Sequence, residues 1–221
     1  MPSLNPNRPS GAKPSRYYND ADWNGQSKMY AFSASNAVAA YKYDVCSFDT
    51  TNRSLPLTDL YLPGCPLVQT VASDITTAIQ RGVIVGFLAE PEFNMTVTAS
   101  LGLMYRVAST KRYAQVIDDP FVIYTIQENA QGYTSTTANA INKSAGTAYT
   151  AGSTTTGISG MQLKTSDVQT AAARPWRILR YTQTVDNFNF VAADNPSYAK
   201  YDVLLANHDI FGEAAMTTFG A

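Results

Sequence analysis

The chain has 221 residues, enough for one domain that buries a substantial core. Its 16 Lys and Arg and 17 Asp and Glu give a formal net charge of -1, which argues against the basic field of a nucleic-acid-binding protein and against an acidic tail. Charged residues are 15% of the chain, whereas Tyr (14) and Phe (9) are frequent. This composition is typical of surfaces that contact other proteins, because interfaces favour aromatic residues and are depleted in Lys and Glu.

Residues 1–24 are predicted to form an extended N-terminal arm. The first 18 residues contain four prolines and almost nothing that could enter a core. We expect either a flexible terminus or an arm that becomes ordered on a neighbouring subunit. In the second case the contact residues would be Arg8, Arg16, Tyr17, Tyr18 and Trp23. The segment lacks the apolar stretch of a signal peptide, so we expect a protein made and kept in a cytoplasm-like compartment.

From residue 28 onward, short alternating apolar runs predict β-strands. The runs are rich in Val, Ile, Tyr, Phe and Thr and are separated by turn residues. They predict an all-β fold, an antiparallel barrel or sandwich, with eight to ten strands. Gly86, inside one run, indicates a bulge or a close backbone approach. The runs cover residues 28–35, 41–49, 81–93, 102–109, 113–117, 121–126, 160–166, 176–184 and 201–209.

One weak helical pattern covers residues 72–82, with Ser73 as a possible N-cap and Gly82 as a stop. Residues 129–160 are rich in Thr, Ser and Gly and predict either a long loop or flat, weakly specified strands. The expected organisation is therefore the arm, a β-rich domain over residues 25–213, and a C-terminal tail over residues 214–221.

Catalytic and metal-binding residues are sparse. The single histidine, His208, lies beside Asp209 at the end of a predicted strand, and we interpret it as a structural histidine. Cys46 and Cys65 are predicted to be buried reduced thiols, with a disulfide between them as the alternative. One histidine and two distant cysteines leave no ligand set, so we expect no metal and no cofactor.

Asp118 and Asp119, before Pro120, raise the question of an acid pair. Together with Glu90 and Glu92 they could serve a glycoside hydrolase, because catalytic carboxylates often lie at strand ends. Asp before Pro is also a common turn, since the carboxylate accepts backbone N–H bonds and Pro fixes φ. We favour the turn, at a subunit contact, and predict a protein that is not an enzyme.

Other ligands also lack a signal. The sequence has no phosphate-binding loop, and no apolar segment approaches the ~18 residues that a membrane span needs. We therefore expect no nucleotide, small-molecule substrate, nucleic acid or membrane as a partner. Residues 176–181 interleave Trp and Tyr with Arg, but as a strand they would place Trp176, Ile178 and Arg180 on one face.

Several blocks in order resemble a family of structural head proteins of tailed bacteriophages. They are "GVIVGF", an Arg-x-Ala-Ser-Thr-x-Arg segment, "DDP" followed by a strand ending in Ile-Gln, "TGISGMQL", and a closing "ANH" strand. The blocks lie at residues 82–87, 106–112, 118–127, 156–163 and 206–208. The resemblance extends over about residues 25–211, and the N-terminal arm departs from it.

This resemblance implies a capsid decoration, or cement, protein on the exterior of the virion, made in a host bacterium. Such a protein would bind the major capsid protein, as a trimer at three-fold and quasi-three-fold positions, and hold neighbouring capsomers together. Two alternatives remain open. One is a carbohydrate-binding or tail/host-attachment β-module, because sugars stack on aromatic rings. The other is the hydrolase that would use the carboxylates named above.

Overall fold

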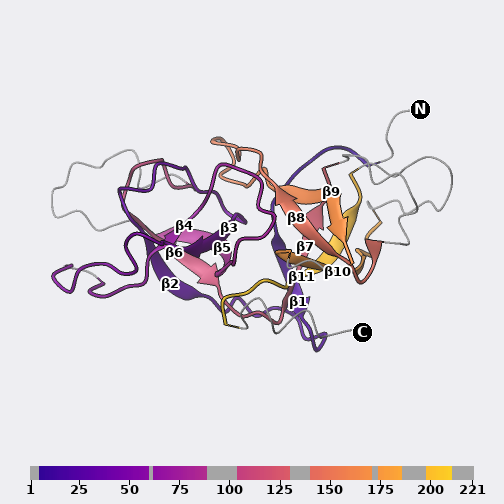
Figure 1. The fold of residues 1–221 in the computed structure, drawn as a ribbon, viewed down its shortest axis with the longest axis horizontal. Coiled ribbons are helices and arrows are strands. Elements are labelled where there is room, and N and C mark those ends of the chain that lie inside the picture. The colour runs from indigo at the N-terminus through magenta and orange to yellow at the C-terminus, as the bar shows by residue number, and fades with distance from the viewer. Residues whose placement is uncertain are drawn as a thin grey trace.

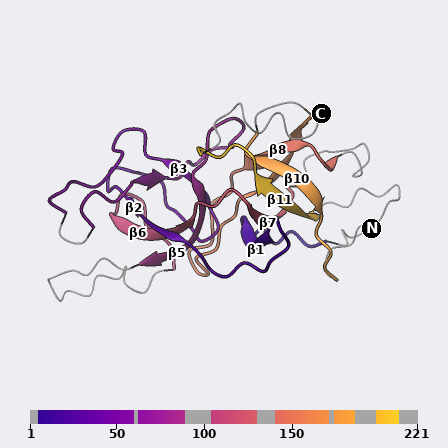
Figure 2. The ribbon, with the colours of Figure 1, turned by 90° about the horizontal axis from the view of Figure 1, so that it is seen from below.

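The computed structural model describes residues 5–59, 62–88, 104–129, 140–170, 174–185 and 198–210. These residues form two antiparallel β-sheets that lie side by side along the long axis of the molecule (Figures 1 and 2). No helix occurs within the described ranges. The predicted all-β fold is therefore confirmed.

The first sheet has six strands in the order β1-β7-β11-β10-β8-β9. It curls, because Glu128, just after β7, forms a bridge with Leu163 in β9. The strands are β1 (Lys13–Tyr17), β7 (Val122–Gln127), β8 (Ser144–Ala148), β9 (Gln162–Gln169), β10 (Trp176–Tyr181) and β11 (Lys200–Leu205).

The second sheet has five strands in the order β2-β6-β5-β3-β4 and forms a nearly closed barrel. Its two edges approach each other where Ala31 in β2 bridges Leu67 beside β4, and the Ala31 N–H donates to the Pro66 carbonyl at 3.0 Å. The strands are β2 (Lys28–Phe32), β3 (Val45–Phe48), β4 (Val68–Gln69), β5 (Gly82–Leu88) and β6 (Arg112–Ile117).

One hydrophobic core joins the two sheets. Val83 and Ile117 of the barrel belong to the same buried cluster as Tyr124 and Trp176 of the six-stranded sheet. The Trp176 side chain is fully buried, packs edge-on against Tyr124 and donates from Nε1 to Thr147 Oγ1 at 2.7 Å. Because the indole N–H has a hydrogen-bond partner, burial of the ring stabilises the fold without leaving an unsatisfied donor.

One local prediction about strands holds, and a second holds in part. The register of β5 against β6 shifts between Ile84 and Gly86, so the glycine marks a β-bulge as predicted. In β10, Trp176 and Ile178 are buried as expected, but the register shifts before Arg180, which is exposed. The predicted shared face therefore ends at Ile178, because a bulge interrupts the two-residue alternation.

The arm prediction needs correction in one respect. Residues 5–12 form no strand, but Lys13–Tyr17 form β1, which pairs with β7 of the same chain. Ala12 is fully buried, and its N–H donates to the Tyr43 carbonyl at 3.0 Å. Almost nothing in this segment was expected to enter the core, and Ala12 does so because a small residue fits where two backbones meet.

Two other predictions differ from the structure. Residues 72–82 form no helix: Ile75 and Gln80 bridge Thr147 and His208, and Gly82 begins β5. Long-range backbone pairing thus overrides a weak local helical pattern. Residues 104–109 form only a bridge, between Arg106 and Ala40.

For residues 129–160 the prediction left open a long loop or weakly specified strands. The described part contains the strand β8, so the second alternative holds for Ser144–Ala148.

Candidate interaction surface

The turn between β6 and β7 is built by Asp119 and Pro120. Asp119 Oδ1 accepts the N–H of Phe121 at 2.8 Å, and the Asp119 carbonyl accepts the N–H of Val122 at 3.4 Å. This side-chain bond to the backbone two residues ahead is the usual way in which Asp stabilises a turn. The turn leaves Phe121 at the surface with 53% of its area exposed. The predicted turn is confirmed for Asp119.

Asp118, by contrast, points into the protein and is 6% exposed. Its Oδ2 atom accepts hydrogen bonds from Lys28 Nζ at 2.9 Å, from the Tyr30 hydroxyl at 3.0 Å and from Arg81 at 2.8 Å. These donors come from β2 and from the start of β5, so the carboxylate ties three strands of the barrel together. Asp118 is therefore a buried anchor beneath the turn.

Arg81 is the centre of this charged network. Its guanidinium makes two hydrogen bonds to the carboxylate of Asp209, at 2.9 and 3.0 Å, and one from Nε to the Tyr30 hydroxyl at 2.6 Å. It also lies over the Phe48 ring, 4.9 Å from the centroid. Both bonds to Asp209 come from the same nitrogen, Nη1, and this charge-assisted pair holds the segment after β11 against the barrel.

The protonation behaviour of the network favours a structural role. Burial raises the pKa of Asp118, but the hydrogen bonds and positive charges of Lys28, Tyr30 and Arg81 outweigh it, and the pKa lies below its ordinary value. A carboxylate of this kind stays ionised and makes a poor proton donor.

His208 does not have the arrangement of a catalytic base. The side chain is fully buried, and burial lowers its pKa. Its Nδ1 atom accepts the N–H of Ile210 at 3.1 Å and lies 3.0 Å from Asp209 Oδ1. In a Ser-His-Asp triad that nitrogen carries the proton and donates a hydrogen bond to the carboxylate instead. This geometry supports the interpretation of His208 as a structural histidine.

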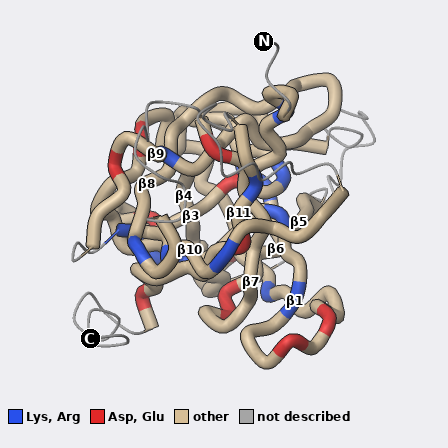
Figure 3. The backbone as a smooth tube through the Cα atoms, turned by 90° about the vertical axis from the view of Figure 1, so that its right-hand side faces the viewer, with Lys and Arg blue, Asp and Glu red and all other residues tan. Residues whose placement is uncertain are grey.

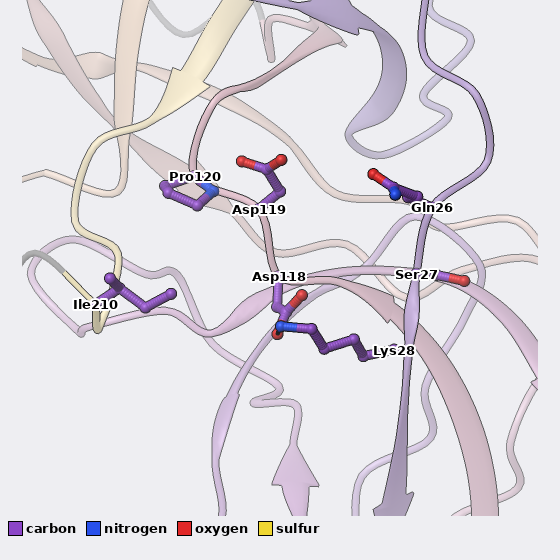
Figure 4. A pocket seen from close by; sticks show the side chains of 7 residues that line it. All are labelled: Gln26, Ser27, Lys28, Asp118, Asp119, Pro120 and Ile210. Atoms are coloured by element: carbon purple, nitrogen blue, oxygen red, sulfur yellow. Dashed lines mark hydrogen bonds and ion pairs between the residues drawn. The ribbon is translucent and has the colours of Figure 1, made fainter.

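A surface pocket of about 390 Å³ lies above the network (Figure 4). In Figure 4 the Lys28 ammonium meets Asp118 at the base, and Asp119 and Gln26 lie on opposite sides. The pocket is lined by Gln26, Ser27, Lys28, Asp118, Asp119, Pro120 and Ile210.

Exposed apolar side chains lie in this pocket and beside it. Ile210, which lines the pocket, is 57% exposed, and Phe121 follows the lining residue Pro120. Tyr18 is 61% exposed, and its N–H donates to the Phe121 carbonyl at 2.8 Å, one position beyond the pair of Tyr17 with Val122. Residues opposite each other in an antiparallel ladder project from the same face, so Tyr18 and Phe121 are neighbours. We call Tyr18, Phe121, Ile210 and this pocket the corner surface.

The structure brings three of the seven predicted contact residues to this corner. Tyr17 and Trp23 are half-buried and pack against the main core. Arg16 bonds to Asp20 and to the buried Asp202 in β11 of the same sheet. Arg8 lies apart, exposed beside Gln127. Tyr18, Asp118 and Asp119 belong to the corner itself.

Sequence reasoning missed Arg81, Phe121, Asp209 and Ile210. The alternating pattern places Phe121 in a strand, and only the turn geometry exposes it. Arg81 offered a signal that could have been used: a lone cation at the start of a buried apolar run must find an anionic partner.

Several other expectations concern ligands. Cys46 and Cys65 are both buried and free, as predicted. Among the described residues there is no group of three or more His, Cys, Asp or Glu that could hold a metal ion. The same part of the chain contains no helix with the length and apolar character of a membrane span. Glu90 and Glu92, the other members of the considered acid set, lie outside the described residues.

Comparisons with known proteins complete the description of the chain. No known protein family, curated protein or solved structure matches it.

Proposed function

We propose that the chain is a non-enzymatic structural protein of a virion that binds the outer capsid surface. In this proposal it assembles as a trimer at three-fold and quasi-three-fold positions and cements neighbouring capsomers of the major capsid protein. The observation that carries the proposal is the corner surface, where Ile210 is exposed in the lining of a pocket and Phe121, directly after the lining residue Pro120, is exposed together with its neighbour Tyr18. The kind of partner, a capsid protein, is inferred from the sequence blocks that resemble phage head proteins.

The corner surface has the properties of a protein contact. Aromatic side chains at the centre of an interface contribute most of its binding energy, whereas single exposed apolar residues elsewhere contribute little. The corner is also stiff, since the Asp118–Arg81 network lies below it and the Asp119 turn fixes Phe121. A rigid patch loses little conformational entropy on binding. Repetition around a symmetry axis then turns modest contacts into strong attachment.

The direct test is co-sedimentation with isolated heads that lack the protein. Wild-type protein should pellet with heads in stoichiometric amounts, raise their resistance to heat, and run as a trimer in light scattering. Tyr18→Ser with Phe121→Ser should weaken head binding at least tenfold, or about 1.4 kcal/mol. The matched control is Leu57→Ser, since Leu57 is 85% exposed and lies outside the corner.

Three results would contradict the proposal: a monomer that ignores heads, equal loss of binding in the Leu57 control, or only a few copies in each particle. The last result would point to a tail or portal component instead.

A carbohydrate-binding or host-attachment module is the second candidate. The same observation favours it, because Tyr18 and Phe121 could stack on sugar rings. A glycan array separates the two functions. The capsid protein should bind no glycan, whereas an attachment module should lose its glycan signal in the Tyr18→Ser, Phe121→Ser variant.

A further inference from the structure

The pocket of the corner surface, which we call the corner pocket, holds more carboxylates than cations. Asp118, Asp119 and Asp209 supply three carboxylates in it and directly below it, whereas Lys28 and Arg81 supply two cations. Both cations are already bound, Lys28 to Asp118 and Arg81 to Asp118 and Asp209. The Asp119 side chain makes no ion pair among the described residues and bonds there only to a backbone N–H. Asp119 is therefore the carboxylate that has no balancing charge.

The groups next to this pocket do not restore the balance. Burial lowers the pKa of His208, so this side chain adds no positive charge at neutral pH. Arg16 of β1 is engaged by two carboxylates, Asp20 at 3.2 Å and Asp202 at 2.5 Å. Asp22 is exposed and forms no ion pair with another described residue. The surroundings thus add negative charge to the corner and no unpaired cation.

These acidic positions gather at one end of the six-stranded sheet. The end of β1 pairs with the start of β7, since Tyr17 lies opposite Val122. The loop after β1 and the turn before β7 therefore lie close together, and Figure 3 shows acidic positions in both. In a chain with a net charge of only -1, the corner is a local concentration of negative charge.

The corner pocket also offers walls for a long side chain. Figure 4 shows Asp119 and Gln26 on opposite sides of the opening, with Pro120 next to Asp119. Pro120 and Ile210 supply apolar lining. The Gln26 side-chain oxygen accepts from the Tyr17 hydroxyl at 3.2 Å and keeps a second lone pair. A cationic head group would find acceptors on both sides, and its aliphatic stem would find apolar surface.

We propose that the corner pocket binds an arginine side chain of the partner protein, with the guanidinium on the Asp119 carboxylate. Only the identity of that partner as a capsid protein rests on the proposed function. Arginine fits better than lysine, because its planar fork can bond to acceptors on both sides and stack on an exposed ring such as Tyr18. Arginine is also enriched at protein interfaces, where lysine is depleted.

A metal ion fits the corner pocket less well. One carboxylate without a balancing charge is a poor ligand set for Ca²⁺, which takes six to eight oxygen ligands. The described residues contain no group of three or more His, Cys, Asp or Glu that could hold a metal ion.

The test is an NMR titration of the full, ¹⁵N-labelled chain with N-acetyl-arginine amide as the probe. The backbone amide signals of Gln26, Lys28, Asp119 and Phe121 should shift as the probe is added. N-acetyl-citrulline amide has nearly the same shape without the charge and should leave these signals in place. N-acetyl-lysine amide should bind more weakly than the arginine probe. Because exposed charges are screened by salt, arginine binding should weaken between about 0.05 M and about 0.5 M salt.

Three variants separate the pocket from the fold. Asp119→Asn should raise the Kd for the arginine probe about threefold or more, and it keeps the turn, since an amide oxygen still accepts the Phe121 N–H. Gln26→Glu places a second carboxylate across the opening and should lower the Kd about twofold or more, a gain that a folding defect cannot produce. The matched control is Asp20→Asn, an exposed carboxylate outside the pocket lining, which should bind like wild type.

Several results would overturn the arginine pocket: no shift of these amide signals, equal binding of the citrulline probe, tighter binding of the lysine probe, or an unchanged Kd in Asp119→Asn. Displacement of the arginine probe by calcium chloride but not by sodium chloride of the same ionic strength would also overturn it.

The two proposals fail separately in the co-sedimentation assay. Wild-type protein and Asp119→Asn that pellet equally with heads contradict only the arginine pocket. Protein whose corner pocket binds the arginine probe but which ignores heads contradicts only the proposed function.

Discussion

The Arg81 guanidinium lies 2.8 Å from the Asp118 carboxylate and joins the start of β5 to the end of β6 beneath the corner surface. The side chains of Arg81 and Asp118 are 14% and 6% exposed, so water screens the pair only weakly. The neighbouring Asp119 faces the turn and bonds only to backbone in the described contacts. The two adjacent carboxylates therefore have different roles. Replacing each of them with asparagine should show this difference.

We expect Asp118→Asn to lower the free energy of unfolding by about 2 kcal/mol, because Arg81 would lose one of its two carboxylate partners and keep only Asp209. Asp119→Asn is the matched control and should cost under about 0.5 kcal/mol, since an amide oxygen still accepts the Phe121 N–H. Urea denaturation measures both. Equal losses at the two positions would show that Asp118 is not an anchor.

The acidic doublet shows what sequence reasoning could reach. Alternating apolar runs predicted the β-strands on either side, and Asp before Pro predicted the turn, because these features depend on a few adjacent residues. The direction of Asp118 could not be predicted, because its partners Lys28, Tyr30 and Arg81 are 90, 88 and 37 residues away. A single sequence does not show which residues that are far apart along the chain lie close together in the fold.

Strand β1 was not predicted, because its local sequence does not have the pattern of a strand. Its sequence, Lys-Pro-Ser-Arg-Tyr, has no apolar alternation, and proline is unfavourable inside a sheet. The strand exists because it lies at the edge, where only β7 pairs with it among the described strands. Edge strands tolerate proline, so composition alone made this segment look like a free arm.

Two buried acids make stability depend on pH. Burial raises the pKa of Glu128 and of Asp44 to about 7 in each case. Between pH ~4.5 and pH ~7 the folded state then holds protons that the unfolded state has released. The stabilisation is complete below the unfolded pKa and is lost as pH rises through the folded pKa.

We therefore expect the free energy of unfolding to fall from pH ~5 to pH ~8, by on the order of 3 kcal/mol for each acid. Glu128→Gln should remove about half of this decline, and Asp44→Asn in addition should remove most of the rest. Asp20→Asn is the control, because its side chain is 80% exposed. Urea denaturation across pH measures the slope, and a slope that Glu128→Gln leaves unchanged would contradict the expectation.

Two glycines of β5 should respond differently to alanine. A Cβ at Gly82 would clash with the backbone carbonyl of Ile117 in β6, which cannot move without shifting the strand. A Cβ at Gly86 would meet only the end of the flexible Gln115 side chain, at 3.1 Å. We expect Gly82→Ala to cost about 3 kcal/mol and Gly86→Ala to change stability by under about 0.5 kcal/mol. Thermal unfolding compares them, and similar losses would mean that the strands do not approach this closely at Gly82.

The last prediction concerns Arg106, whose fully buried guanidinium bonds to groups in the loops of the barrel. Its hydrogen bonds reach the carbonyls of Ser33, Asn36, Val38 and Thr110 and the side-chain oxygen of Asn36. The charge also lies over the Phe32 ring, 4.9 Å from the centroid. A guanidinium has five N–H donors in a fixed plane, and this site uses every one.

Arg106→Lys keeps the charge but offers only three donors from one point, so buried carbonyls would lose their partners. We expect a loss of about 3 kcal/mol in the free energy of unfolding, measured by urea denaturation. Arg53→Lys is the matched control, at an exposed position, and should change stability by under about 0.5 kcal/mol. If Arg106→Lys were equally neutral, charge alone would hold the loops, and the planar fork that connects residues 33–38 to residues 106–110 would be dispensable.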